Sequence, residues 1–130
     1  MKSLLFLLWF FPLLALAELP PSAYENMQAK APEYLKIEVL RVDVSPGEKP
    51  EDQNVHIVAM VTQVIRTASE VKADDIINIF YTITEQPKGW DGPGAIPLLT
   101  DKQQTVAYLE KRDVPTEYKP VAGRMSFSNF

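Results

Sequence analysis

The sequence has no cysteine, and this absence removes several kinds of site at once. Without thiols the chain has no disulfide, no thiolate zinc ligand and no cysteine nucleophile. A lipid anchor attached to a cysteine at a processed N-terminus is excluded as well. The sequence also lacks an Asn-x-Ser/Thr acceptor, so N-glycosylation is not expected.

Histidine is almost as scarce, because His56 is the only one. A zinc site would need a second histidine or a cysteine, and no Gly-x-Ser-x-Gly segment offers a nucleophile for a serine-hydrolase relay. His56 alternates with Val55 and Ile57, so we interpret it as a surface residue of a strand. The acidic clusters do not match an EF-hand loop. We therefore expect no metal site, no cofactor and no catalytic residue.

The N-terminus resembles an export signal. Lys2 precedes an apolar run of 14 residues (4–17), which ends in small residues at Ala17. This order is typical of a secretory signal peptide. The alternative is a membrane anchor, but a spanning helix needs roughly 20 apolar residues, and the run contains Pro12. We predict a signal peptide over residues 1–17, a periplasmic or secreted location, and no stable membrane span after cleavage before Glu18.

The predicted mature chain is short and acidic. Removing residues 1–17, which include Lys2, takes the chain from 130 to 113 residues and its net charge from −4 to −5. This length suits one compact domain. Nucleic-acid binding requires a basic groove, so the acidic charge and the predicted export argue against nucleic acid as a partner.

Two β-rich segments lie at the centre of the chain, at residues 54–66 and 76–84. Both are crowded with Val, Ile, Thr and aromatic residues, which favour strands. Their apolar residues recur at every second position, so one face of each strand is expected to be buried. The residues on these faces are Val55, Ile57, Ala59 and Val61, and Ile77, Ile79, Tyr81 and Ile83.

An earlier strand is predicted over residues 34–44, and its apolar pattern changes phase between Val39 and Leu40. The first apolar set is Leu35, Ile37 and Val39, and the second is Leu40, Val42 and Val44. A one-residue shift of this kind indicates a β-bulge, with which small barrels turn a corner.

Later segments are shorter. Residues 95–99 form a brief apolar run, residues 105–109 predict a strand, and residues 121–127 predict a last strand. Residues 112–120 between them read as a charged connection bracketed by prolines.

Ahead of the first strand, Ser22 and Glu25 have the spacing of a capping box, which favours a helix over residues 23–30 that ends at Pro32. A flexible N-terminus is the alternative. We therefore expect a lead or short helix over residues 18–33. An all-β domain follows over residues 34–130, as a five- or six-stranded OB-like barrel whose closure protects its edges.

The order of these elements resembles OB-fold barrels. The phrase Val-x-Ala-x-Val-x-x-Val-x-x-Thr, followed by Val-Lys-Ala-Asp-Asp-Ile-Ile-x-Ile-x-Tyr, is similar to their second and third strands. It is particularly similar to the netrin-like branch that includes the tissue inhibitors of metalloproteinases. The chain also resembles small exported bacterial proteins with a Gly-Trp-x-Gly-Pro loop (residues 89–93) and an Ala-Gly-x-x-Ser-Phe ending (residues 122–127). The N-terminal cysteine with which the inhibitors chelate zinc is absent, so their mechanism is not implied here.

The loop around Trp90 is the predicted recognition site. It holds three of the five glycines, and an aromatic side chain at a loop tip can anchor a partner. We predict binding residues at Trp90, Asp91, Tyr118 and Arg124. The alternative is that Trp90 folds back as a lid over one end of the barrel.

One further motif invites a catalytic interpretation. Ser69 and Lys72 match the Ser-x-x-Lys pattern of penicillin-recognising enzymes, but the Ser-Asp-Asn and Lys-Thr-Gly partners are missing. A solvated turn is the simpler interpretation.

These observations favour a non-catalytic exported module that recognises a protein or envelope component through loops. Two alternatives stay open. One is a small inhibitor or hydrolase-associated accessory protein. The other is a structural envelope subunit whose exposed strand edge pairs with another chain. The sequence specifies neither the partner nor the oligomeric state.

Overall fold

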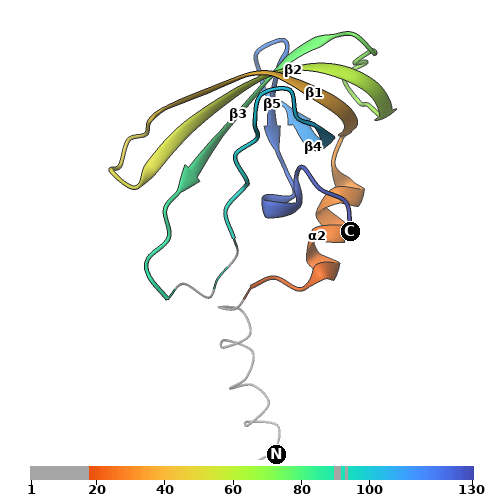
Figure 1. Cartoon of the computed structure of the whole chain (residues 1–130). Coiled ribbons are helices and arrows are strands. Elements are labelled where there is room, and N and C mark those ends of the chain that lie inside the picture. The colour runs from red at the N-terminus through yellow and green to blue at the C-terminus, as the bar shows by residue number, and fades with distance from the viewer. Residues whose placement is uncertain (1–17, 90–91, 93) are drawn as a thin grey trace, which may run out of the picture.

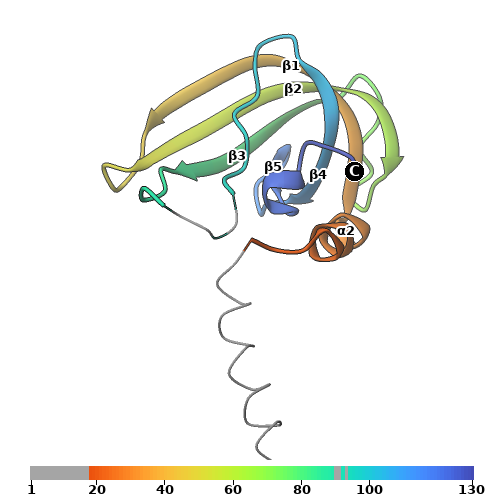
Figure 2. The same cartoon turned by 60° about the horizontal axis from the view of Figure 1, so that its bottom comes forward.

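The computed structural model describes residues 18–89, 92 and 94–130, and five strands in them form a closed barrel (Figures 1 and 2). The strand order is β1-β2-β3-β5-β4, with β4 returning to β1. Neighbouring strands are antiparallel except β3 and β5, which are parallel. The strands are β1 (Glu33–Pro46), β2 (Asp52–Arg66), β3 (Ile76–Thr84), β4 (Gln104–Lys111) and β5 (Glu117–Pro120). The predicted all-β, OB-like barrel is confirmed.

The barrel interior is built from the alternating apolar residues. The predicted faces of the two central strands are buried except at Ile83, which is partly buried, and Ile57, Ala59, Val61 and Ile79 are fully enclosed. Tyr81 also points inward, and its hydroxyl donates to the carbonyl of Pro97 at 2.9 Å. Burial raises the pKa of Tyr81 to about 12. The core is therefore the one that the period-two pattern predicts.

Bulges bend the long hairpin of β1 and β2 around this core. Val39 pairs with Ala59 and Arg41 with Val58, which leaves Leu40 without a partner in β2. This is the predicted position of the phase change. In β2, Thr62 is left out in the same way, since Lys36 pairs with Gln63 and Ile37 with Val61. Extra residues of this kind increase strand twist and redirect side chains.

A helix, α2 (Pro21–Lys30), packs beside the barrel near the C-terminal segment (Figures 1 and 2). It confirms the short N-terminal helix, but the capping-box interpretation of Ser22 is wrong. Pro20 occupies the N-cap, no side chain caps the helix, and Pro21 stands in the first turn. Proline suits this position because its missing N–H would have no helical partner there.

The prediction of a last strand over residues 121–127 is also wrong. The fifth strand lies earlier, at β5, and the chain then turns into a 3-10 helix, η1 (Gly123–Met125). Gly123 has a φ of +52°, which a strand cannot continue. Ser126 fixes the turn, because its Oγ accepts from the Ala122 amide at 3.0 Å and donates to the Gly123 carbonyl at 2.7 Å.

The apolar run at residues 95–99 forms no strand but contributes to the core. Leu99 is buried and Ile96 packs against the same cluster. Pro97 lies between them and has no N–H to donate to a strand ladder. The long connection between β3 and β4 therefore packs against the barrel interior.

Candidate functional site

The structure leaves the predicted loop site only partly described. Trp90 and Asp91 lie outside the described residues, so their predicted role stays a prediction. Tyr118 lies on β5 with 4% of its surface exposed, and its hydroxyl is 2.9 Å from Ser69 Oγ. Its ring is part of the core.

Arg124 belongs to a different set of contacts. Its guanidinium lies over the Tyr24 ring at 4.7 Å, and its Nε is 3.4 Å from the Glu18 carboxylate. That carboxylate also accepts from the Tyr24 hydroxyl and from the Gly94 amide. These hydrogen bonds, with Tyr24 foremost, lower the pKa of Glu18, while burial raises the pKa of Tyr24. Tyr118 thus belongs to the barrel core, whereas Arg124 belongs to a separate set of contacts with Glu18 and Tyr24.

Ser69 is tied to a buried carboxylate rather than to Lys72. Glu33 is 1% exposed, and it accepts from Ser69 Oγ at 3.0 Å, from Thr67 Oγ1 at 2.5 Å and from the Ala68 amide at 3.2 Å. Lys72 is exposed, and its backbone amide donates to Asp75 at 2.9 Å. A buried carboxylate with this many donors holds the β2–β3 connection against β1. The arrangement is structural.

His56 lies on the outer face of β2 in a row of contacting side chains. It stacks on Phe80 with ring centroids 4.3 Å apart, and its Nε2 is 2.8 Å from Asn78 Oδ1. Arg112 lies over the same Phe80 ring at 5.1 Å. The π surface of Phe80 is thus already engaged by protein groups, which leaves little of it for a ligand.

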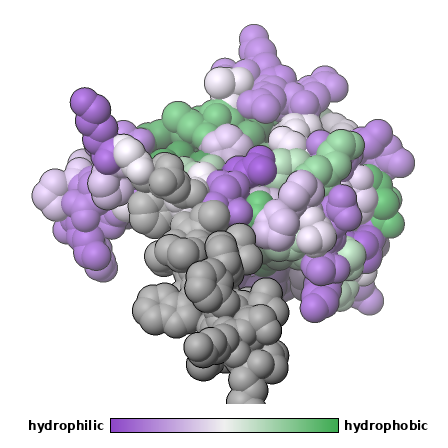
Figure 3. Space-filling model, turned by 90° about the horizontal axis from the view of Figure 1, so that it is seen from below, coloured by the Kyte–Doolittle hydropathy of each residue, from purple (hydrophilic) through white to green (hydrophobic). Residues whose placement is uncertain are grey.

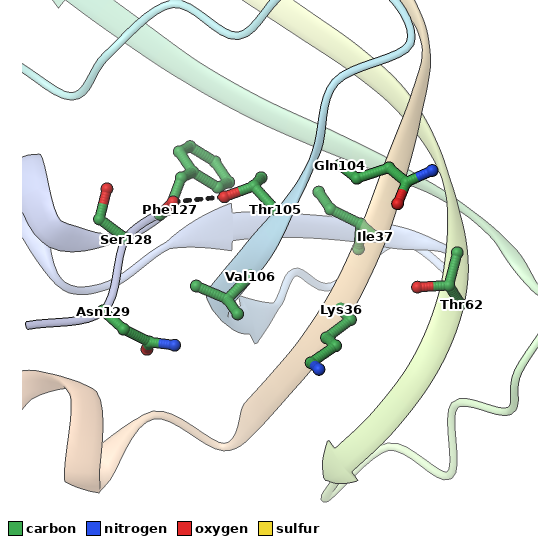
Figure 4. Close-up of a pocket in the computed structure, with 9 residues that line it drawn as sticks. All are labelled: Lys36, Ile37, Thr62, Gln104, Thr105, Val106, Phe127, Ser128 and Asn129. Carbon is green, nitrogen blue, oxygen red and sulfur yellow. Dashed lines mark hydrogen bonds between the residues drawn. The ribbon is translucent and has the colours of Figure 1, made fainter.

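A groove of about 500 Å³ is a better candidate for a ligand site (Figure 4). Figure 4 shows that its walls come from β1 and β2 on one side, from β4, and from the C-terminal segment on the other side. This volume falls within the usual range of small-molecule pockets. The lining residues are Lys36, Ile37, Thr62, Gln104, Thr105, Val106, Phe127, Ser128 and Asn129.

The strand side of the groove depends on the second bulge. Because Thr62 has no partner in β1, its side chain leaves the regular alternation of β2 and lines the groove. Lys36 comes from β1, where it pairs with Val106 of β4. Gln104 Nε2 lies 3.3 Å from the carboxylate of Glu38, which holds the amide at the edge of the groove.

The opposite wall is the C-terminal segment, which side chains hold in place. Thr105 Oγ1 donates to the Phe127 carbonyl at 2.6 Å, and Gln28 of α2 donates to the Ser128 carbonyl at 2.8 Å. Asn129 Oδ1 accepts from the hydroxyl of Tyr108 at 2.5 Å. Burial, together with the hydroxyl of Tyr34, raises the pKa of Tyr108, so this hydroxyl stays a donor at neutral pH.

Several polar groups of the groove make no hydrogen bond to the described part of the chain. These groups are Lys36 Nζ, Thr62 Oγ1, Ser128 Oγ and Asn129 Nδ2. They offer an ammonium, two hydroxyls and an amide above an apolar floor formed by Ile37, Val106 and Phe127. Such a lining suits a small ligand rich in hydroxyl groups, with room for one negative charge.

Little in the sequence indicates this groove. Lys36 reads as the polar position of an alternating strand, and Ser128 and Asn129 lie in a polar tail. The one usable signal is in β2, where Val64 breaks the apolar phase set by Val61 and so indicates an irregularity near Thr62. Nothing in the sequence places that irregularity beside the C-terminus.

The surface seen from below is mixed, with hydrophilic and hydrophobic residues side by side (Figure 3).

In residues 18–89, 92 and 94–130, no helix is long and apolar enough to cross a membrane. Within that same part of the chain, no group of three or more histidine or acidic side chains is placed to hold a metal ion.

Comparison with known proteins adds no family. A scan against family models, a search of curated proteins and a search of solved structures each found no match. The strand topology alone defines the class of the protein, which is a small closed five-stranded β-barrel of OB-like form.

Proposed function

We propose that the protein is an exported, non-catalytic binding module that holds a hydroxyl-rich part of an envelope component, such as a sugar unit, in the groove between β1, β4 and the C-terminal segment. The observation that carries this proposal is the set of polar groups around an apolar floor that make no hydrogen bond to the described residues, led by Thr62 and Ser128 on opposite walls. Hydroxyls and amides over an apolar surface match the alternating polar and apolar faces of a saccharide.

The chemistry of the lining supports binding over catalysis. Lys36 is the one titratable side chain among the nine described residues of the groove. General acid–base catalysis requires a group that exchanges a proton near neutral pH, usually with a second group that orients it. A single lysine among hydroxyls and amides supplies attraction for a negative charge and hydrogen bonds, which are properties of a binding site.

Rigidity supports the same conclusion. Both walls are fixed by the fold: Thr62 by the strand pairing on either side of it, and the C-terminal segment by the hydrogen bonds from Thr105 and Gln28. Preorganised groups lose less conformational entropy when a ligand binds. The apolar N-terminal run supports export, and an exported protein meets envelope saccharides directly.

Titration with short oligosaccharides, some neutral and some carrying a uronic acid, tests this function. The readout is the amide spectrum of the labelled protein. We expect shifts confined to residues around Thr62, Val106 and Ser128, and weaker binding in Thr62→Val and Ser128→Ala. Thr82→Val, on the outer face of β3, is the matched control and should bind normally. Shifts elsewhere, or the same affinity in all three variants, would refute the groove as the site.

A further inference from the structure

Among the described residues, strand β1 has a free edge along its second half. Its first half, residues 33–38, pairs with β4 on one side and β2 on the other. The last contacts on the β4 side are made at Val39, whose amide and carbonyl bond to Gln103 and Lys102. From residue 40 to residue 46, β1 pairs with β2 alone among the described strands, and Figure 2 shows this part at the rim of the sheet.

This edge is an open strand with exposed apolar side chains. Leu40 is 42% exposed and Val44 is 45% exposed. An unpaired strand edge presents backbone donors and acceptors that another strand can use. Natural proteins usually protect such an edge, and here Pro46 limits its length.

The side chains along the edge are complementary to their own copy. Read from residue 40 to residue 44, they are apolar, positive, apolar, negative and apolar. In an antiparallel pair centred on Val42, Arg41 of each copy lies opposite Asp43 of the other, and Leu40 lies opposite Val44. Directly opposed residues share a face, so these opposite charges would meet.

We propose that two copies of this chain associate through residues 40–46 of β1, antiparallel and in the register centred on Val42. The interface is isologous, as in most closed dimers, and the sheets of the two barrels join across it. The proposal does not depend on the ligand groove. It gives a physical form to the edge pairing that a structural envelope subunit would use.

Charge sets the register of this dimer more than its strength. In a single copy, Arg41 Nε and Asp43 Oδ2 lie 2.9 Å apart, and both side chains are more than half exposed. The two internal pairs, one in each copy, would be exchanged for two pairs across the interface, so the number of ion pairs stays the same, and exposed pairs contribute weakly. Placing like charges opposite each other is unfavourable, however, and this makes the register testable.

Sedimentation experiments over a range of about 1 µM to 1 mM, with no ligand present, test the proposal. We expect a concentration-dependent dimer for the unaltered chain. Arg41→Asp opposes two acidic groups and Asp43→Arg opposes two basic groups, so each variant alone should dissociate at least tenfold more readily. Mixing the two in equal amounts should restore association as a heterodimer. The control Lys119→Asp, on β5, should not alter the dimer.

The double variant with Arg41→Asp and Asp43→Arg exchanges both charges and should dimerise like the unaltered chain.

A second measurement does not depend on charge. Because the chain has no cysteine, Val42→Cys introduces a single thiol that should form a disulfide with its own copy on oxidation. Val58→Cys, one strand inward, should not. A chain that stays monomeric at about 1 mM, or a dimer unaffected by either single charge reversal, would overturn the proposal.

Discussion

The two halves of β1 differ in burial and in the number of strands with which they pair. In residues 33–39, every second side chain is buried, and Leu35 and Val39 have no exposed surface. In residues 40–46, which follow the bulge at Leu40, no side chain is fully buried. A single strand thus passes from the closed wall of a barrel to an open edge.

The comparison shows how a small β domain separates stability from interaction. The closed half buries every second side chain and pairs its backbone with strands on both sides, so it contributes to the free energy of unfolding. In the open half, the backbone pairs with β2 on one side and with no described strand on the other. The bulge lies at the point of change, where strand pairing on the β4 side ends.

The largest predicted effect contrasts the halves directly. Leu35→Ala removes a fully buried side chain and should lower the free energy of unfolding by about 2–5 kcal/mol. Val44→Ala changes an exposed residue and should alter it by less than about 0.5 kcal/mol. Urea unfolding at low protein concentration measures both. Equal losses would show that the open half belongs to the core after all.

A smaller effect is expected at the start of the closed half. Glu33→Ala removes the acceptor used by Thr67 and Ser69, and unpaired buried donors should cost about 1–3 kcal/mol of stability. Glu33→Gln keeps one acceptor oxygen and should lose less. If both variants unfold at the same urea concentration as the unaltered protein, the carboxylate does not hold the β2–β3 connection.

A single substitution in the groove should change the free energy of ligand binding by less than Leu35→Ala or Glu33→Ala changes the stability. Thr62→Val keeps the shape of the side chain and removes one hydroxyl, so the free energy of saccharide binding should weaken by about 0.5–1.5 kcal/mol, or roughly twofold to thirteenfold in affinity. Calorimetry with the tightest oligosaccharide from the titration gives the affinity, and a thermal melt confirms that stability is kept. An unchanged affinity would mean that the bulged side chain does not contact the ligand.

The smallest effect concerns the Glu18 cluster, which lies away from both halves of β1. Because the pKa of Glu18 is lowered in the folded state, its stabilising contacts are present above the usual pKa of 4.5. They are lost as the pH falls through the folded value. The stability difference between the unaltered chain and Glu18→Gln should therefore be visible at pH 7 and shrink as the pH is lowered below 4.5. A difference that persists at low pH would contradict this assignment.

Much of the barrel could be predicted because its information is local. Alternation predicted the buried faces of β2 and β3, and a single change of phase predicted the bulge at Leu40. The end of the chain was mispredicted for a reason that is also local. The alternation from Val121 to Phe127 suggested a strand, but the positive φ of Gly123 and the Ser126 hydroxyl fix a turn.

The candidate site could not be predicted, because it joins distant parts of the chain. Lys36 and Ser128 line the same groove only because β1 pairs with β4 and the C-terminal segment lies along β4. Likewise, Glu33 precedes a predicted strand, and nothing in the sequence indicates that the turn at Ser69 encloses its carboxylate. Such contacts depend on the closure of the barrel, which the spacing of residues along the sequence does not predict.

Hydrogen exchange resolved by residue along β1 tests the central comparison most directly. In dilute protein, amides of residues 34–39 should exchange slowly, as part of the closed wall, while outward-facing amides of residues 42–45 should exchange fast. At high concentration the second group alone should slow down, as the free edges pair. Uniform protection along the whole strand at every concentration would contradict the account, because β1 would then have no open half.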